Sequence, residues 1–182
     1  KNINGTQIGF VNNVGGYFNG AQIGFVNLSR KYVSGVQTGF VNLCNDSFTG
    51  AQIGFVNVVK DSMVGTQIGF VNAATKGLKG IQFGFVNISK NGIAGSQIGF
   101  VNIADSMRQG IPLGFVSIVR KGGFSAFEIG TSTLFLSTLS YKIGIPTLYT
   151  SVILSFNPSY TNQFAYGIGF RVYDQVEQNI WI

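Results

Sequence analysis

The side chains that could carry catalysis or bind a metal are few and scattered in this chain. Its 182 residues include no histidine, one cysteine and six carboxylates. The carboxylates are Asp46, Asp61, Asp105, Glu128, Asp174 and Glu177. General acid–base catalysis, zinc sites and Ser-His-Asp triads all need such groups close together. The sequence therefore predicts no enzyme activity, no cofactor, and no catalytic, cofactor-binding or metal-binding residue.

The single cysteine, Cys44, is predicted to be a small, semi-buried side chain rather than a nucleophile. It can form no disulfide within the chain. It also occupies a repeat position that elsewhere holds Val, Ser or Ala. A thiol at such a position packs as a small hydrophobic group.

Basic residues are concentrated in the first two thirds of the chain. Residues 1–123 contain ten basic and three acidic side chains, whereas residues 124–182 contain two and three. Such an excess favours an anionic membrane surface, a polysaccharide or a nucleic acid. The bases fall singly or in pairs, as in Arg30-Lys31, rather than in blocks, which disfavours nucleic acid as a partner. The glycine-rich GxQxGF segments lack the strand before and the helix after that a phosphate-binding loop needs.

One unit of eight residues recurs eight times at a constant spacing of 15 residues. The units are GTQIGFVN at 5–12, GAQIGFVN at 20–27, GVQTGFVN at 35–42, GAQIGFVN at 50–57, GTQIGFVN at 65–72, GIQFGFVN at 80–87, GSQIGFVN at 95–102 and GIPLGFVS at 110–117. A fixed period without insertions means that each unit is one supersecondary element stacked on the next.

The unit reads as a β-strand, because its side chains alternate with period two and nothing recurs at helical spacing. The segments between units carry turn residues and one apolar residue, which predicts a turn and a short second strand or packed corner. An antiparallel meander or barrel would show a two-unit period, and none appears. We therefore predict an all-β fold: a β-solenoid of eight 15-residue coils, stacked in parallel about 4.8 Å apart.

Stacking in register places equivalent residues in columns. The Asn12 and Gln7 columns are predicted to form amide ladders, and the Phe10 column an aromatic stack. We expect the Ile8 and Phe10 columns to form the core, closed on the other side by the column that runs from Phe18 to Ile93. Whether the Gln-Gly-Val side of the strand faces inward or outward is left open.

The period stops after residue 123, so the chain is predicted to comprise a repeat solenoid at 1–123 and an antiparallel β segment at 124–182. Alternating segments at 133–145, 147–156 and 163–173 predict three antiparallel strands. Two interpretations of this second part stay open. It is a cap or sheet that covers the open edge of the solenoid, or it belongs to an outer-membrane β-barrel, whose strands alternate in this way.

The tandem GxQxGFVN units, the closing GIPLGFVSIVRKGG and the following FEIGTSTLFLSTLSYKIGIPTLYTSVILSF and FAYGIGFRVY segments resemble the surface-repeat proteins of Gram-negative bacteria. The resemblance covers nearly the whole chain and offers no functional residues to carry over. It implies association with the cell surface or outer membrane and no known catalysis.

These observations predict a non-catalytic repeat protein of a bacterial cell surface or outer membrane that acts as a scaffold or binding surface. The alternative is a transmembrane β-barrel that acts as a pore or membrane anchor. Expected partners are the outer membrane, other surface proteins, or further copies of the chain, which would associate through an uncapped N-terminal edge.

Overall fold

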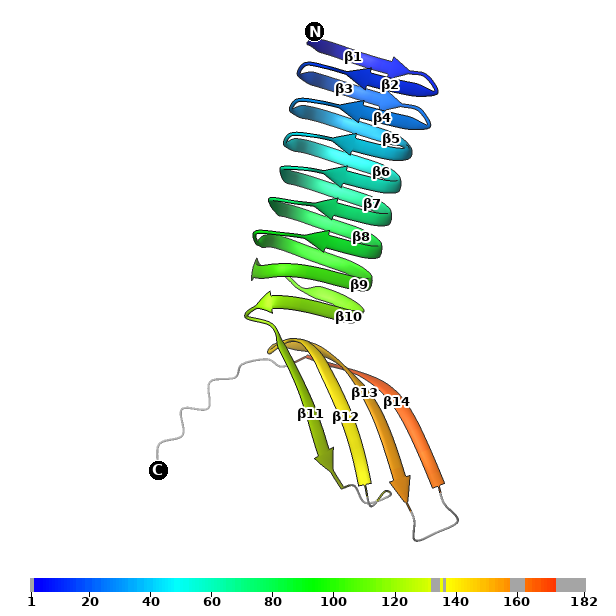
Figure 1. Ribbon diagram of the computed structural model, residues 1–182, viewed down its shortest axis with the longest axis vertical. Coiled ribbons are helices and arrows are strands. Elements are labelled where there is room, and N and C mark those ends of the chain that lie inside the picture. Colours follow the sequence, from blue (N-terminus) through cyan, green and yellow to red (C-terminus); the bar gives the residue numbers. More distant parts are fainter. Residues whose placement is uncertain (1, 132–134, 136, 158–162, 173–182) are drawn as a thin grey trace. The chain divides into compact units, whose positions relative to one another are not determined.

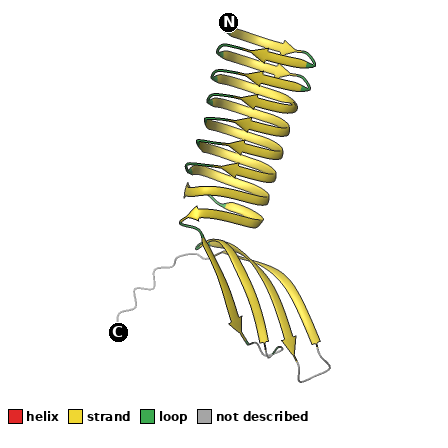
Figure 2. Cartoon of the chain, in the orientation of Figure 1, coloured by secondary structure: helices red, strands yellow, loops and turns green. Residues whose placement is uncertain are grey.

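The computed structural model describes residues 2–131, 135, 137–157 and 163–172. In this part of the chain every regular element is a strand (Figure 2). The chain divides into two compact units, Lys1–Gly122 and Gly123–Ile182. We describe each unit by itself.

The first unit is a β-solenoid whose coils stack along one axis (Figure 1). This confirms the predicted fold class. Neighbouring strands are parallel, in the order β1-β3-β5-β6-β7-β8-β9-β10, and β2 and β4 continue the first two coils. The strands are β1 (Ile3–Ile8), β2 (Val11–Val14), β3 (Phe18–Ile23), β4 (Val26–Ser29), β5 (Val33–Cys44), β6 (Phe48–Val59), β7 (Ser62–Ala74), β8 (Gly77–Ser89), β9 (Ile93–Gln109) and β10 (Pro112–Lys121).

Each coil has two legs that meet at a Gly-Phe corner, defined as Gly9-Phe10 and its equivalents. In the first two coils the legs are separate strands, and from β5 onward one strand continues through the corner. Each residue of the paired segments lies beside the residue 15 positions away, as in Gly35 with Gly50 and Asn42 with Asn57. This register confirms the predicted columns of equivalent side chains.

Two glycines in each coil are needed because neighbouring backbones come very close. Gly50 has φ of +130°, which L side chains rarely adopt, and a Cβ there would overlap the carbonyl oxygen of Gly35. At the corner, a Cβ on Gly54 would overlap the carbonyl oxygen of Gly39 and approach Asn42 Nδ2 to 2.6 Å. The repeated glycines therefore allow the coils to stack at strand spacing.

The core differs from the prediction at the corner. The column from Phe18 to Ile93 is buried as expected, with no member more than 3% exposed. The Ile8 and Phe10 columns are outside, so their placement in the core is wrong. The physical reason is that the corner shifts the alternation by one residue: Gln22 on the first leg and Asn27 on the second leg both point inward, five positions apart.

The second unit is a four-stranded antiparallel sheet in the order β11-β12-β13-β14. Its strands are β11 (Phe124–Gly130), β12 (Ser137–Ile145), β13 (Leu148–Asn157) and β14 (Gln163–Val172). Strand β11 was not predicted as a separate strand. The predicted segments at 133–145 and 163–173 include residues 133, 134, 136 and 173, which lie outside the described residues.

Candidate binding surface

The interior of the solenoid is rich in amides. Each asparagine of the column from Asn12 to Asn87 donates from its side-chain Nδ2 to Oδ1 of the asparagine in the following coil, at 2.8–3.0 Å. Each glutamine in the Gln22 to Gln97 column donates from Nε2 to Oε1 of the glutamine in the preceding coil, at 2.6–2.9 Å. The two ladders therefore run in opposite directions, and both predicted ladders are confirmed.

The asparagine ladder also holds the corner. Asn27 Nδ2 donates to the carbonyl oxygen of Thr38 at 2.9 Å, and Asn42 Nδ2 to that of Ile53 at 3.0 Å. These carbonyls come just before the Gly-Phe corner of the next coil. A buried amide that bonds both its neighbour and the corner backbone satisfies polar groups that would otherwise be costly to bury.

Both ladders end in the last coil, where the repeat sequence changes to GIPLGFVS. Pro112 stands where a glutamine would be, and the buried Oε1 of Gln97 has no hydrogen-bond partner among the described residues. Ser117 replaces the asparagine: it accepts from Asn102 Nδ2 at 3.3 Å and donates from Oγ to the carbonyl oxygen of Pro112 at 2.8 Å. The last unit therefore terminates both ladders, because Pro112 and Ser117 take the places of the glutamine and the asparagine.

The exterior carries the aromatic rings. Consecutive rings of the Phe10 column lie 4.9–5.0 Å apart and nearly parallel through all eight coils, which confirms the predicted Phe stack. Stacking covers their faces, yet the rings from Phe25 to Phe100 stay 44–47% exposed. Beside them, Ile23, Ile53 and Ile68 are 42–45% exposed. We call the Ile8 and Phe10 columns together the apolar stripe.

Charged residues lie at the other end of each coil. None of the ten residues from Gly5 to Val14, or of the equivalent ten in the other seven units, is ionisable apart from Cys44. The charges fall instead on and just after the turn that joins one coil to the next, here called the turn edge. Its charged residues are Arg30, Lys31, Asp46, Lys60, Asp61, Lys76, Lys90, Asp105, Arg120 and Lys121. Two further charged residues of the described solenoid, Lys79 and Arg108, lie on β8 and near the end of β9.

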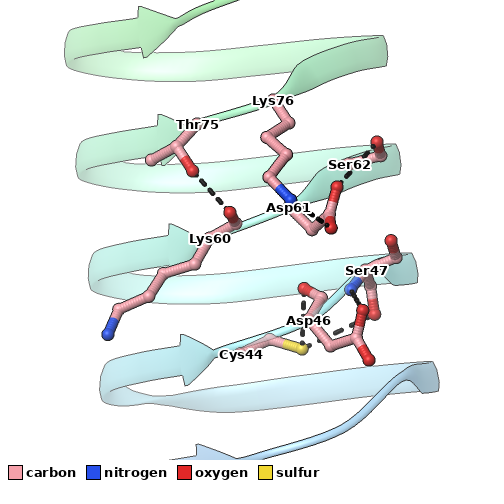
Figure 3. A network of polar contacts seen from close by, with 8 residues as sticks. All are labelled: Cys44, Asp46, Ser47, Lys60, Asp61, Ser62, Thr75 and Lys76. Atoms are coloured by element: carbon pink, nitrogen blue, oxygen red, sulfur yellow. Dashed lines mark hydrogen bonds and ion pairs between the residues drawn. The ribbon is translucent and has the colours of Figure 1, made fainter.

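Opposite charges at the turn edge pair between neighbouring coils. Lys76 Nζ lies 3.0 Å from Asp61 Oδ2 (Figure 3), and Arg120 Nη1 lies 3.2 Å from Asp105 Oδ1. The hydrogen bond from Lys76 holds the pKa of Asp61 below its ordinary value. Since these pairs are solvent-exposed, each adds little to the stability of the fold.

Cys44 lies in the interior beneath the turn edge (Figure 3). Its Sγ is 3.3 Å from the carbonyl oxygen of Asp46 and 3.5 Å from those of Lys31 and Ser47. Burial raises the pKa of the thiol to about 11. The thiolate needed for nucleophilic attack is therefore scarce at neutral pH, and burial is more complete than the predicted semi-buried position.

The second unit presents a further apolar surface. On one face of its sheet, Phe127, Ile129, Phe164 and Tyr166 are 74–89% exposed. The other face holds an ion pair between Lys142 and Glu128, and Lys142 Nζ lies 5.2 Å from the ring centre of Tyr149. The strand register confirms that the two groups lie on opposite faces of the sheet: Phe127 pairs with Tyr141 on the apolar face, whereas the next residue, Glu128, pairs with Ser140 on the other face.

Two further features concern metal ions and membranes. Among the residues that the structure describes, no three His, Cys, Asp or Glu side chains gather where they could hold a metal ion. Within the same described ranges there is no helix of the length and hydropathy that crossing a bilayer requires.

Comparison with known proteins found no matching family model, curated protein or solved structure. The resemblance to surface-repeat proteins therefore stays a prediction.

The sequence-based prediction missed the apolar stripe, because it placed the Ile8 and Phe10 columns in the core. The available signal was the absence of charge over the same ten positions of all eight units, on both sides of the corner.

Proposed function

We propose that this chain is a non-catalytic repeat protein of a bacterial cell surface or outer membrane, in which the solenoid is a scaffold and the apolar stripe is its binding surface. The observation that carries the proposal is the stripe: aromatic and aliphatic side chains stay about half exposed in column after column, while amides occupy the interior. Large contiguous apolar patches on proteins mark surfaces that bind a partner or a membrane.

The regular coils support a scaffold role. Backbone pairing connects each coil to the next, and two amide ladders connect all coils but the last in the same way, so the stripe is held at a constant spacing. An extended surface of this kind suits binding rather than turnover, since repeat proteins use such surfaces for recognition.

Cell-surface placement is tested by labelling intact cells of the organism that makes the protein with a membrane-impermeant amine reagent. Lys60, Lys76 and Lys90 are exposed at the turn edge and report the result by peptide mass spectrometry. We expect these lysines to be labelled on intact cells. Labelling that requires cell lysis would overturn the surface assignment.

A transmembrane barrel is the second candidate, supported by the second unit. Four strands of seven to ten residues alternate an apolar face with a face of small, polar and paired charged residues, as the strands of membrane barrels do. Extraction tests this role: strict dependence on detergent supports it, and release of the full chain by salt or urea alone contradicts it.

A further inference from the structure

The apolar stripe has a shape that restricts what can cover it. Ile23 lies on the first leg, Phe25 at the corner and Val26 on the second leg, so the apolar columns wrap around the end of the coil. A rigid partner with a flat surface contacts one of these sides and leaves the others in water. A fluid hydrocarbon phase contacts all of them.

The backbone at the corner is suited to an apolar medium. Gly9 N donates to the carbonyl oxygen of Ile23 at 3.1 Å, and Val26 N donates to that of Phe10 at 3.0 Å. The same two bonds recur in the next coil, from Gly24 to Thr38 and from Val41 to Phe25. Because polar backbone groups exposed to lipid must be satisfied within the protein, this pairing lets the corner enter an apolar layer.

The charges are placed where water would remain. A first leg such as Phe18–Ile23 has six residues and spans about 20 Å at roughly 3.3 Å per residue. Amphipathic elements that lie in a membrane interface enter it by about 5–10 Å. Insertion of the corner to that depth takes in the apolar stripe and leaves the basic turn edge in solvent.

Resting on the proposed function of the stripe as a binding surface, we infer that its partner is the hydrocarbon boundary of a lipid bilayer. The solenoid lies along the membrane with its Gly-Phe corners inserted and its turn edge directed away. The stripe of eight rings is about 35 Å long, from the ring spacings of 4.9–5.0 Å. Since the charges lie more than a Debye length of about 8 Å from the bilayer, binding depends little on salt or on anionic lipid.

The test places a fluorescent probe on each edge of the full-length chain in a Cys44→Ala background. Alanine fits this position, because Ala74 and Ala104 occupy the same buried column. One variant carries the probe on Thr38→Cys in the stripe, and the matched control carries it on Lys60→Cys at the turn edge. Both are mixed with phosphatidylcholine vesicles with and without brominated acyl chains. We expect bromine quenching at position 38 and none at position 60.

A second variant checks that the stripe provides the binding energy. Ile23→Thr, Ile53→Thr and Ile68→Thr are combined, because Thr38 already occupies this column and shows that the fold accepts threonine there. Three half-exposed isoleucines lose enough apolar area that vesicle affinity should fall at least tenfold. The control, Lys60→Gln with Lys90→Gln, should stay within about twofold of the parent, and circular dichroism should be unchanged in both.

Four outcomes would overturn the lipid assignment. Quenching at position 60 alone would mean that the basic edge docks. Vesicle binding without quenching at either position would place the contact in the second unit. Self-association that the isoleucine substitutions abolish would identify a second copy as the partner. An absence of vesicle binding would rule out a lipid bilayer as the partner. Cell-surface placement would still be decided separately, by the amine-labelling experiment.

Discussion

At the scale of the residue, two columns of amides are buried in the solenoid while two columns of apolar side chains are exposed. Asn57 is fully buried and bonds Asn42, Asn72 and the carbonyl oxygen of Ile68. Phe55, two residues earlier, is 45% exposed. The amide is tolerated inside because every coil supplies its partner.

Asn57→Ala should therefore lower the free energy of unfolding by about 2–4 kcal/mol, because it leaves the Asn72 oxygen buried without its donor. Asn19→Ala, at an exposed position of the first leg, should cost about 0.5 kcal/mol or less. Urea denaturation followed by circular dichroism measures both. Equal losses for the two variants would contradict a structural role for the ladder.

The buried thiol gives a pH-dependent prediction. Burial raises the pKa of Cys44 to about 11, above the ordinary thiol value of 9.0. Because the folded state holds the proton more tightly, this contribution is fully present below pH 9 and is lost as the pH rises from 9 to 11.

The loss should reach about 2–3 kcal/mol in the parent chain. Cys44→Ala should lack this component, so the difference between the two stability curves isolates it from tyrosine and lysine titration. Urea midpoints measured from pH 7 to 11 check the prediction. Parallel curves for the parent and the variant would show that Cys44 titrates normally.

At the scale of the element, the repeat predicted most of the fold. A constant 15-residue period, the period-two alternation and the repeated glycines led to parallel in-register coils, which the structure confirms. The corner was not predictable in the same way. Alternation along a straight strand puts Gln22 and Val26 on the same side, whereas the bend at Gly-Phe leaves Gln22 buried and Val26 partly exposed.

In the second unit the predicted antiparallel sheet is confirmed, and strand β11 was missed for a different reason. Residues Phe124–Gly130 contain glutamate, serine and alanine among their apolar residues, so their alternation is weak. Pairing with β12 supplies the missing stability, as Ile129 opposite Leu139 illustrates. A strand that is stabilised mainly by pairing with its neighbour is hard to recognise from its own sequence.

Removal of one complete coil should be tolerated, because each coil contacts only its neighbours. Deletion of residues 51–65 joins Gly50 to Thr66 and restores the unit GTQIGFVN. We expect a folded protein whose thermal midpoint changes by only a few degrees. Deletion of residues 51–64 shifts every later residue by one position and should lower the midpoint by about 10 °C or more.

Thermal melts followed by circular dichroism compare the two deletions. Their difference of one residue makes each the control for the other. If the 14-residue deletion were as stable as the 15-residue deletion, register along the columns would not hold the coils together.

At the scale of the whole molecule, each unit, taken by itself, separates its exposed apolar side chains from its charged ones. In the solenoid, most charged residues lie at the turn edge, and exposed apolar side chains line the corner. In the second unit, one face of the sheet is apolar and the other carries Lys142 and Glu128. Each unit thus has a surface suited to an apolar partner and one suited to water.

The most direct test of the stripe as the functional surface is photocrosslinking in intact cells of the organism that makes the protein. The probe, p-benzoylphenylalanine, replaces Phe55 in the stripe or, as the control, Lys60 at the turn edge, and both proteins are illuminated in place. We predict abundant crosslinks to envelope components from position 55 and few from position 60. Crosslinks from position 60 alone, or from neither position, would contradict the assignment of the stripe as the face that binds.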